Sequence, residues 1–232
     1  SQIELRVLAM LSGDETLQNT FKEGKDIHTI VASRVFGVSE SDVTKDMRRK
    51  AKVINFGIIY GMGISALQKN LGVTRGEATL FYEQYFGAFP TIKEYLDSIK
   101  VGATEKGYTE TAFGRRRYFP GLKSNVQFMR SFAERMATNA PIQGTAADII
   151  KLAIIAVDKA IQDAGLTDKA FLLLQIHDEL VYEVENSVQA QVSKLIEETM
   201  VSVLKDPILP YVGDEVALAV SSLHADTLDK LK

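Results

Sequence analysis

The chain has 232 residues, of which 46% are hydrophobic and 25% are charged, a composition that is ordinary for a folded globular protein. The absence of cysteine excludes disulfides and thiolate metal sites. No apolar run approaches the roughly 20 residues that a membrane-spanning helix needs, and a net charge of −3 does not by itself indicate a nucleic-acid partner.

The first two-thirds of the chain has the pattern of helices separated by glycine, proline and capping residues. At its start, Ser1 and Glu4 have the spacing of a capping box, although Ile3, Leu5 and Val7 also alternate as in a strand. Further helices are predicted from Ser12-x-x-Glu15 to Gly24, from Asp26 to Gly37, over 43–61, from Thr74-x-x-Glu77 to just before Pro90, over 91–105, and over 124–139 and 142–163, which Pro141 divides.

The last third of the chain contains strand patterns. A hairpin with the polar tip His177-Asp178-Glu179 follows a smaller strand pair around Gly114. An amphipathic helix and one further strand come after it. The sum is an α+β fold, in which helices are segregated from a small antiparallel sheet. The smaller strand pair is predicted over 107–120 and the hairpin strands over 170–176 and 180–184. The amphipathic helix is predicted over 187–204 and the last strand over 211–223.

One helical stripe combines two cations with two aromatic side chains. Arg48, Lys52, Phe56 and Tyr60 follow one another at intervals of four, so they share one face of the helix predicted over 43–61. Arginine and lysine neutralise phosphates, and an aromatic face can stack on a base. The stripe therefore suits a nucleoside triphosphate. The alternative is that the aromatics belong to the core and the cations are merely solvated.

The residues around this stripe closely resemble the fingers helix of family A DNA polymerases. Residues 48–61 read RRKAKVINFGIIYG, and the family pattern is Arg, three residues, Lys, then Asn-Phe-Gly and Tyr-Gly. The resemblance implies that Arg48 and Lys52 bind the incoming triphosphate, with Lys52 also taking part in catalysis. It further implies that Phe56 packs on the sugar and base of the nucleotide and that Tyr60 lies at the nascent base pair.

Two other stretches supply nucleotide contacts by the same resemblance. Residues 26–29, DIHT, match the family and make His28 a phosphate contact. Residues 1–6, SQIELR, resemble the family's Asp-Tyr-Ser-Gln-Ile-Glu-Leu-Arg with its first two residues removed. The resemblance assigns Gln2 and Glu4 to the nucleotide site, where Glu4 blocks the ribose 2′-hydroxyl. That role is compatible with Glu4 serving as a helix-capping residue.

The hairpin tip offers carboxylates for phosphoryl transfer, which needs positioning and metal ions more than covalent help. Asp178 is one candidate, although aspartate in a turn is often only turn chemistry. Residues 175–179, QIHDE, resemble the family's His-Asp-Glu palm motif. By that resemblance Asp178 is a Mg²⁺ ligand and Glu179 is an accessory acid. His177 and Gln175 then contact the primer end or its minor groove.

The family's second metal carboxylate precedes the Ser-Gln-Ile-Glu stretch and therefore falls before residue 1. We expect truncation, with Asp-Tyr encoded immediately before Ser1, in preference to replacement by Asp14, which has the pattern of a helix start. On this expectation residues 1–232 alone extend primers little or not at all, because one metal carboxylate and the thumb are missing.

A polar stripe in residues 134–148, ERMATNAPIQGTAAD, also resembles the family. Arg135, Asn139 and Gln143 suit the minor groove, whose degenerate acceptor pattern lets a polymerase check geometry without reading sequence. The alternative is ordinary polarity on a helix surface. Residues 114–117, Gly-Arg-Arg-Arg, match a family turn, where we expect structural pairing or contact with the template backbone.

The resemblance covers nearly the whole chain and implies a right-hand polymerase with helical fingers over 26–125, a palm over 1–25 and 126–232, and no thumb. The expected function is template-directed DNA synthesis with Mg²⁺ as cofactor. The expected partners are primer-template DNA and deoxynucleoside triphosphates, with no membrane. We expect a monomer in the cytoplasm, at a bacterial nucleoid or in a phage-infected cell. Two alternatives stay open: a non-catalytic nucleic-acid-binding remnant, and a single-subunit RNA polymerase, against which Glu4 and the Asn-Phe-Gly pattern argue.

Overall fold

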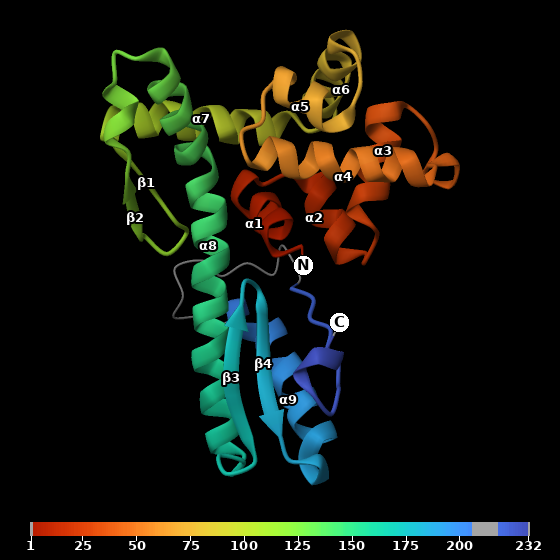
Figure 1. The fold of residues 1–232 in the computed structure, drawn as a ribbon, viewed down its shortest axis with the longest axis vertical. Coiled ribbons are helices and arrows are strands. Elements are labelled where there is room, and N and C mark those ends of the chain that lie inside the picture. The colour runs from red at the N-terminus through yellow and green to blue at the C-terminus, as the bar shows by residue number, and fades with distance from the viewer. Residues whose placement is uncertain (1, 206–217, 232) are drawn as a thin grey trace. The chain divides into compact units, whose positions relative to one another are not determined.

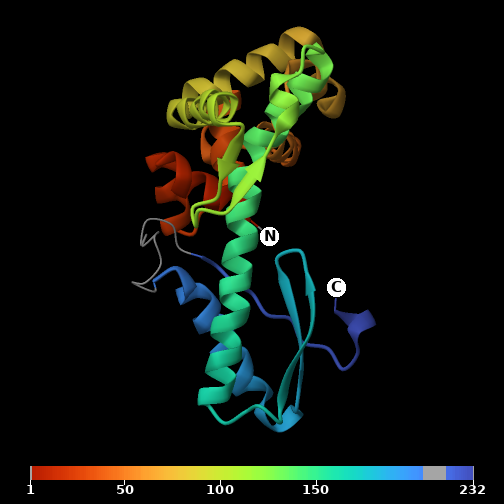
Figure 2. The same cartoon turned by 90° about the vertical axis from the view of Figure 1, so that its left-hand side faces the viewer.

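The computed structural model describes residues 2–205 and 218–231, which form two compact units. The first unit comprises residues 2–146, and the second comprises the chain from residue 147 onward. The long helix α8 (Gln127–Asp163) contributes residues to both units (Figures 1 and 2). The α+β class is confirmed, because the described residues form mostly helices with two small antiparallel sheets.

The first unit consists mainly of helices joined by short turns. Its one sheet is a two-stranded hairpin, as predicted around Gly114. Before α8 its elements are α1 (Ile3–Ser12), α2 (Glu15–Lys22), α3 (Ile27–Phe36), the 3₁₀ turn η1 (Glu40–Asp42), α4 (Lys45–Ile59), α5 (Ile64–Leu71), α6 (Arg75–Ala88), α7 (Pro90–Lys106), β1 (Tyr108–Glu110), β2 (Arg116–Tyr118) and the 3₁₀ turn η2 (Pro120–Lys123).

Capping side chains set where these helices begin. Asp26 caps α3, as predicted, and Thr74 and Glu77 form the predicted capping box of α6. The predicted box at Ser12 and Glu15 is wrong. Asp14 caps α2 instead, because Ser12 still belongs to α1.

Buried apolar side chains of α1, α3 and α4 form a core in the first unit. The start of the chain is a helix and not a strand: α1 follows the N-cap residue Gln2 and contacts α2, α4 and α7. Leu5 and Leu8 of α1, Ile27 of α3 and Ile54 of α4 are fully buried. This packing holds α3 beside α4, and so it positions the side chains that the pair presents to solvent. The predicted capping box at the first residue lies outside the described residues.

The hairpin of the first unit packs closely against α8. The Ala112 N–H donates to Thr145 Oγ1 over 2.9 Å. A Cβ on Gly144 would lie 2.6 Å from Thr111 Cγ2, a distance that real Cβ atoms essentially never show. A side chain at position 144 would therefore displace Thr111, and glycine allows the hairpin to pack this closely on the helix.

The predicted break at Pro141 is wrong, because α8 continues through this residue for 37 residues in all. Proline cannot donate the usual helical hydrogen bond, and an interior proline costs a helix about 3 kcal/mol. Ala137, Pro141 and Ile142 are all buried. Packing on both sides of the proline offsets the missing bond, and side chains before and after it share one helix.

The second unit packs a hairpin against the end of α8 and one further helix (Figure 1). The predicted strands are confirmed in antiparallel register, with Gln175 opposite Leu180 and a bulge between Leu172 and Leu174. The helix predicted over 187–204 is also confirmed, with short 3₁₀ turns at its ends. The elements are β3 (Ala170–Ile176), β4 (Glu179–Val184), η3 (Asn186–Val188), α9 (Gln189–Ser202), η4 (Val203–Lys205) and η5 (Leu228–Lys230).

The core of this second unit draws on α8, β3 and α9. Val157 and Ile161 of α8, Ala170 of β3 and Val192 of α9 are buried together. The strand predicted over 211–223 lies outside the described residues up to position 217, and residues 218–223 form no strand.

Helix α8 also bears on the expectation that no apolar segment is long enough to span a membrane. By length and composition alone, α8 is long enough to cross a membrane, and one stretch of it is apolar enough. Half of that stretch is buried inside the protein, and the core helix of a globular protein passes the same test.

Candidate functional site

The cationic and aromatic stripe predicted on α4 lies on an accessible side of the helix. Arg48 and Lys52 are exposed, Phe56 is half-buried, and Tyr60 at the C-cap is 44% exposed. The Phe56 and Tyr60 rings are stacked, with centroids 6.4 Å apart and an angle of 18° between their planes. Other α4 side chains, such as Ile54, fill the core. The alternative that both aromatics are core residues is therefore wrong for Tyr60.

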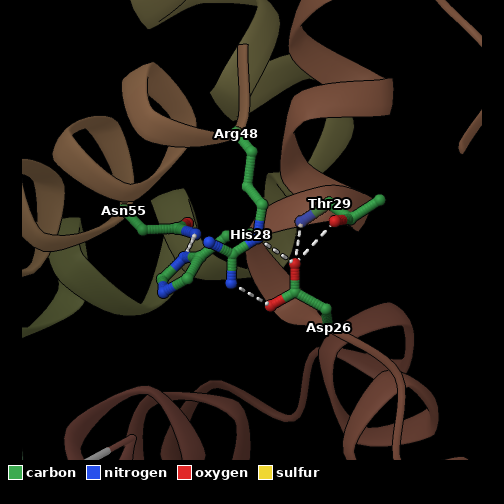
Figure 3. Close-up of polar contacts among 5 residues, drawn as sticks. All are labelled: Asp26, His28, Thr29, Arg48 and Asn55. Atoms are coloured by element: carbon green, nitrogen blue, oxygen red, sulfur yellow. Dashed lines mark hydrogen bonds and ion pairs between the residues drawn. The ribbon is translucent and has the colours of Figure 1, made fainter. Parts of the chain in front are cut away.

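Arg48 forms a bidentate ion pair with Asp26 at the start of α3 (Figure 3). The Arg48 Nε donates to Asp26 Oδ2 over 2.7 Å, and Nη2 donates to Oδ1 over 3.0 Å. Asp26 Oδ2 also accepts hydrogen bonds from the Thr29 backbone N–H at 3.0 Å and from the Thr29 hydroxyl at 2.5 Å. One carboxylate thus caps α3 and holds one edge of the guanidinium on α4.

The hydrogen bonds at Asp26 determine its ionisation. Partial burial favours the neutral acid, but the hydrogen bonds from Arg48 and Thr29 outweigh it and lower the pKa of Asp26 to about 2. The same pairing raises the pKa of Arg48. Both groups are therefore fully charged at neutral pH.

His28 lies behind the stripe and is only 3% exposed. Its Nδ1 is 3.2 Å from the Asn55 side-chain nitrogen, and its ring centroid is 5.9 Å from that of Phe56. Burial lowers the pKa of His28, and the nearby cations Arg48 and Lys52 lower it further, against the opposing effect of Asp26. The imidazole is thus neutral at pH 7. A phosphate contact would use Nε2, because Asn55 engages Nδ1 (Figure 3).

Glu4 connects α1 to the end of the stripe. The Tyr60 hydroxyl donates to Glu4 Oε2 over 2.7 Å. Burial, the hydrogen bond to Glu4 and the negative charge of Glu4 together raise the pKa of Tyr60 to about 12. The phenol therefore remains a donor at neutral pH. Gln2, the other nucleotide contact predicted in this stretch, is the half-buried N-cap residue of α1.

A tight turn after the stripe brings α4 against α8. Gly61 has a φ of +67°, and a Cβ at this position would lie 3.1 Å from Arg135 Cγ. Glycine therefore allows both the turn and the close approach. A pocket of about 290 Å³ opens beside this contact, and Tyr82, Phe86 and Lys93 contribute to its walls. Sequence patterns gave no sign of the pocket, because its lining comes from several helices.

The polar stripe on α8 is continuous because the helix does not break. Arg135, Asn139 and Gln143 follow at intervals of four, and Asn139 Nδ2 donates to Gln143 Oε1 over 3.5 Å. The Arg135 guanidinium lies 5.8 Å from the centroid of the Phe132 ring. Arg135 and Gln143 are exposed, so this face can contact a ligand.

The three hairpin arginines all have partners inside the first unit. Arg115 donates to the Gly144 carbonyl over 3.0 Å, and Arg116 pairs with Glu110 over 2.7 Å. Arg117 lies 5.3 Å from the centroid of the Phe119 ring. These contacts agree with the structural pairing expected for this turn.

Asp14, which was the alternative metal carboxylate, is buried and structural. Its Oδ1 accepts the Leu17 N–H over 2.9 Å, and its Oδ2 accepts the Thr91 hydroxyl over 2.5 Å. Only 4% of the residue is exposed. With one bond to α2 and one to α7, this carboxylate joins helices and does not face a substrate.

The tip of the β3–β4 hairpin is a two-residue turn, His177-Asp178. His177 has a φ of 56°, which is uncommon for a residue with a side chain. The Gln175 side chain donates to the His177 carbonyl over 3.3 Å. His177 and Glu179 are exposed and Asp178 is half-buried. Across residues 2–205 and 218–231, no group of three His, Cys, Asp or Glu side chains is arranged to hold a metal ion.

Comparisons with known proteins agree over nearly the whole chain. Residues 1–226 match the model of DNA polymerase family A. DNA polymerase I of Streptococcus pneumoniae is 48% identical over 216 residues, which are 93% of this chain and 24% of the relative. DNA polymerase I of Geobacillus stearothermophilus is 49% identical over 200 residues, 86% of this chain and 23% of the relative. The chain thus spans about a quarter of the length of these curated relatives.

A solved structure is also similar. It is described as the POL domain of Pol1 from M. smegmatis in complex with DNA primer-template and dNTP. Its TM-score is 0.86 and its sequence identity is 44%, and the match covers 95% of this chain and 37% of that one.

Proposed function

The chain belongs to DNA polymerase family A, and on that premise we propose that it carries nucleotide-binding and catalytic surfaces of a DNA-directed DNA polymerase. The observation that carries the proposal is the exposed stripe on α4, where two cations precede two stacked aromatic rings. A nucleoside triphosphate needs both a phosphate-binding end and a base-stacking end, and the stripe offers both.

In this proposal the first unit binds the incoming nucleotide. Arg48 and Lys52 bind the triphosphate, and Lys52 stabilises the negative charge that builds up during transfer. The Phe56 ring packs on the sugar and base, and Tyr60 lies at the nascent base pair. Glu4, which accepts a hydrogen bond from the Tyr60 hydroxyl, excludes a ribose 2′-hydroxyl. His28 and Gln2 complete the nucleotide contacts.

The hairpin tip supplies the acidic groups. Asp178 and Glu179 place two carboxylates at one turn, and this donor set fits Mg²⁺, which proteins bind through one or two carboxylates together with substrate phosphates. Members of this family use divalent metal ions, and Asp178 would hold one here. When bound, Mg²⁺ would neutralise charge on the reacting phosphates.

The reaction joins the primer 3′-oxygen to the α-phosphorus and breaks the bond to the leaving pyrophosphate, while the hydroxyl proton passes to solvent. Gln175 and His177 orient the primer end. The Arg135, Asn139 and Gln143 stripe reads the minor groove. The partners are primer-template DNA and deoxynucleoside triphosphates, the two kinds of ligand with which the M. smegmatis POL domain is in complex. We propose a monomer that works in the bacterial cytoplasm.

A second candidate is a non-catalytic nucleic-acid-binding protein. It is favoured by one observation, that the described residues offer no three-ligand metal group. The two candidates differ in whether Asp178 and Glu179 support chemistry or only the shape of the turn.

The test is primer extension by a chimaera in which residues 1–232 replace the matching segment of a full-length bacterial relative. We expect template-directed extension with deoxynucleotides and Mg²⁺, and poor use of ribonucleotides because of Glu4. A chimaera that folds and binds primer-template without extending it would favour the non-catalytic candidate. Equal use of ribonucleotides would contradict the role of Glu4 and favour RNA synthesis.

A further inference from the structure

The pairing of Asp26 with Arg48 is the interaction that the nucleotide-binding scheme leaves unused. It joins residues 22 positions apart on α3 and α4. About half of the Arg48 side chain remains accessible within the pair. A carboxylate that already pairs with an arginine ordinarily competes with an anionic ligand for it. The geometry of the pair explains why Arg48 can pair with Asp26 and still bind an anion.

Asp26 occupies only one edge of the guanidinium. Its two oxygens take Nε and Nη2 of Arg48, which is the side-on arrangement. A guanidinium carries five N–H donors in a planar fork, so three remain, two on Nη1 and one on Nη2. The edge formed by these three can bind a second anion with two parallel hydrogen bonds. Asp26 therefore does not block Arg48 from a phosphate.

Asp26 is itself held firmly. Its Oδ2 accepts two further hydrogen bonds from Thr29, and its position is that of the N-cap of α3. The next residue, Ile27, is fully buried, which anchors the cap to the core. Figure 3 shows Arg48 paired with a carboxylate that Thr29 also engages, so one edge of the guanidinium is held at the start of α3.

We propose that Asp26 is a positioning residue for the triphosphate: it holds the Arg48 fork with its outer edge ready for phosphate. The proposal rests on the proposed function, in which Arg48 binds the nucleotide. An arginine side chain that is already ordered loses less conformational entropy when it binds. Asp26 thereby strengthens binding of an anion although it is itself an anion.

Whether Asp26→Asn weakens or tightens triphosphate binding distinguishes a positioning role from the alternative roles of Asp26. If Asp26 were an internal competitor for Arg48, or acted only through its charge, Asp26→Asn would tighten triphosphate binding. If it positions Arg48, the same substitution weakens binding. Asparagine caps helices as well as aspartate does, so α3 keeps its start. Asp46→Asn is the matched control, because Asp46 pairs with Arg49 and Lys50 on the same helix.

The experiment measures binding of dATP, and separately of inorganic tripolyphosphate, to residues 1–232 in the presence of Mg²⁺. We expect Asp26→Asn to raise both dissociation constants about three- to tenfold, with Asp46→Asn within twofold of the parent. Thr29→Val, which loosens Asp26 without removing its charge, should raise them in the same direction by less. Unchanged or tighter binding by Asp26→Asn would overturn the proposal.

A double-mutant cycle separates positioning from general damage to the fold. In an Arg48→Ala background, Asp26→Asn should have no further effect on binding, because the group that it positions is gone. An equal, additive loss in both backgrounds would indicate a merely structural role and overturn the proposal. If Arg48→Ala itself leaves binding unchanged, the proposed nucleotide site fails. If Arg48→Ala weakens binding and Asp26→Asn does not, only the positioning role fails.

Discussion

The α3–α4 site of the first unit and the β3–β4 tip of the second differ in how their polar groups are held. In the first unit, the two oxygens of Asp26 accept hydrogen bonds from Arg48 and Thr29. Glu4 accepts a hydrogen bond from the Tyr60 hydroxyl. At the tip, His177 and Glu179 are exposed, and the turn is defined by an unusual backbone angle. The proposed nucleotide site is therefore held by side-chain pairing between helices, whereas the acidic tip combines a positive φ at His177 with the hydrogen bond from Gln175 to the His177 carbonyl.

This difference predicts that binding and chemistry can be separated by substitution. Changes at the α3–α4 site should act on nucleotide affinity, since its geometry is set by contacts within the first unit. Changes at the tip should act on the rate of extension, since its carboxylates are the acidic groups in the proposed reaction.

The largest separation is expected at Asp178. In the chimaera, Asp178→Asn should lower the rate of primer extension by at least about 100-fold, because a metal-binding charge contributes several kcal/mol to transfer. Binding of dATP to residues 1–232 should stay unchanged. Glu183→Gln, an exposed carboxylate on the same hairpin, is the control and should extend normally. Extension by Asp178→Asn within tenfold of the parent would remove the acidic tip from the mechanism.

The scaffold of the first unit should respond strongly to a methyl group at one contact. Gly144→Ala places a carbon 2.6 Å from Thr111 and should lower the free energy of unfolding by about 1–3 kcal/mol, measured by urea denaturation. Gly102→Ala, a helical glycine with nothing within 4 Å of the added carbon, should instead raise it by about 0.5–1 kcal/mol. If both substitutions stabilise the chain, the hairpin is not fixed at this contact.

At the turn of the second unit, removal of a side chain should stabilise the chain, whereas addition of one at Gly144 should destabilise it. His177→Gly relieves a positive φ and should raise stability by about 1 kcal/mol, while it lowers primer extension in the chimaera. His177→Val should destabilise, because a β-branched side chain tolerates that angle least. Urea denaturation of residues 1–232 compares the three chains. A destabilised His177→Gly would mean that the side chain, and not the backbone angle, determines the turn.

The smallest effect concerns pH and the Asp26 pair. The pKa of Asp26 is lowered from 3.8 to about 2, so its stabilising effect is complete above pH 3.8 and is lost as the pH falls through about 2. Because the pair is partly exposed, we expect a contribution of about 1 kcal/mol. Between pH 5 and pH 2 the parent should therefore lose about that much more stability than Asp26→Asn. Parallel pH profiles of unfolding free energy would contradict the pairing.

Local patterns in the sequence predict much of this molecule. The capping box at Thr74, the cap at Asp26 and the hairpin with its acidic tip depend on neighbouring residues, and all three are present in the structure. The exposed stripe on α4 follows from helical periodicity in the same way.

Contacts between distant residues could not be predicted this way. The Arg48–Asp26 pair depends on how α3 packs against α4, and the Tyr60–Glu4 bond spans 56 positions. At Pro141 the local rule predicts a break, and burial on both sides overrides it. Each case depends on tertiary packing, which no short pattern encodes.

Binding of dATP with Mg²⁺ to residues 1–232 tests the central claim most directly. Arg48 and Arg49 are adjacent on α4, but only Arg48 belongs to the stripe, while Arg49 pairs with Asp46. We predict that Arg48→Ala raises the dissociation constant about 10- to 100-fold, as expected for the loss of charge-assisted hydrogen bonds, and that Arg49→Ala changes it less than twofold. Equal effects of the two substitutions, or none from either, would contradict the assignment of the α4 stripe as the triphosphate site.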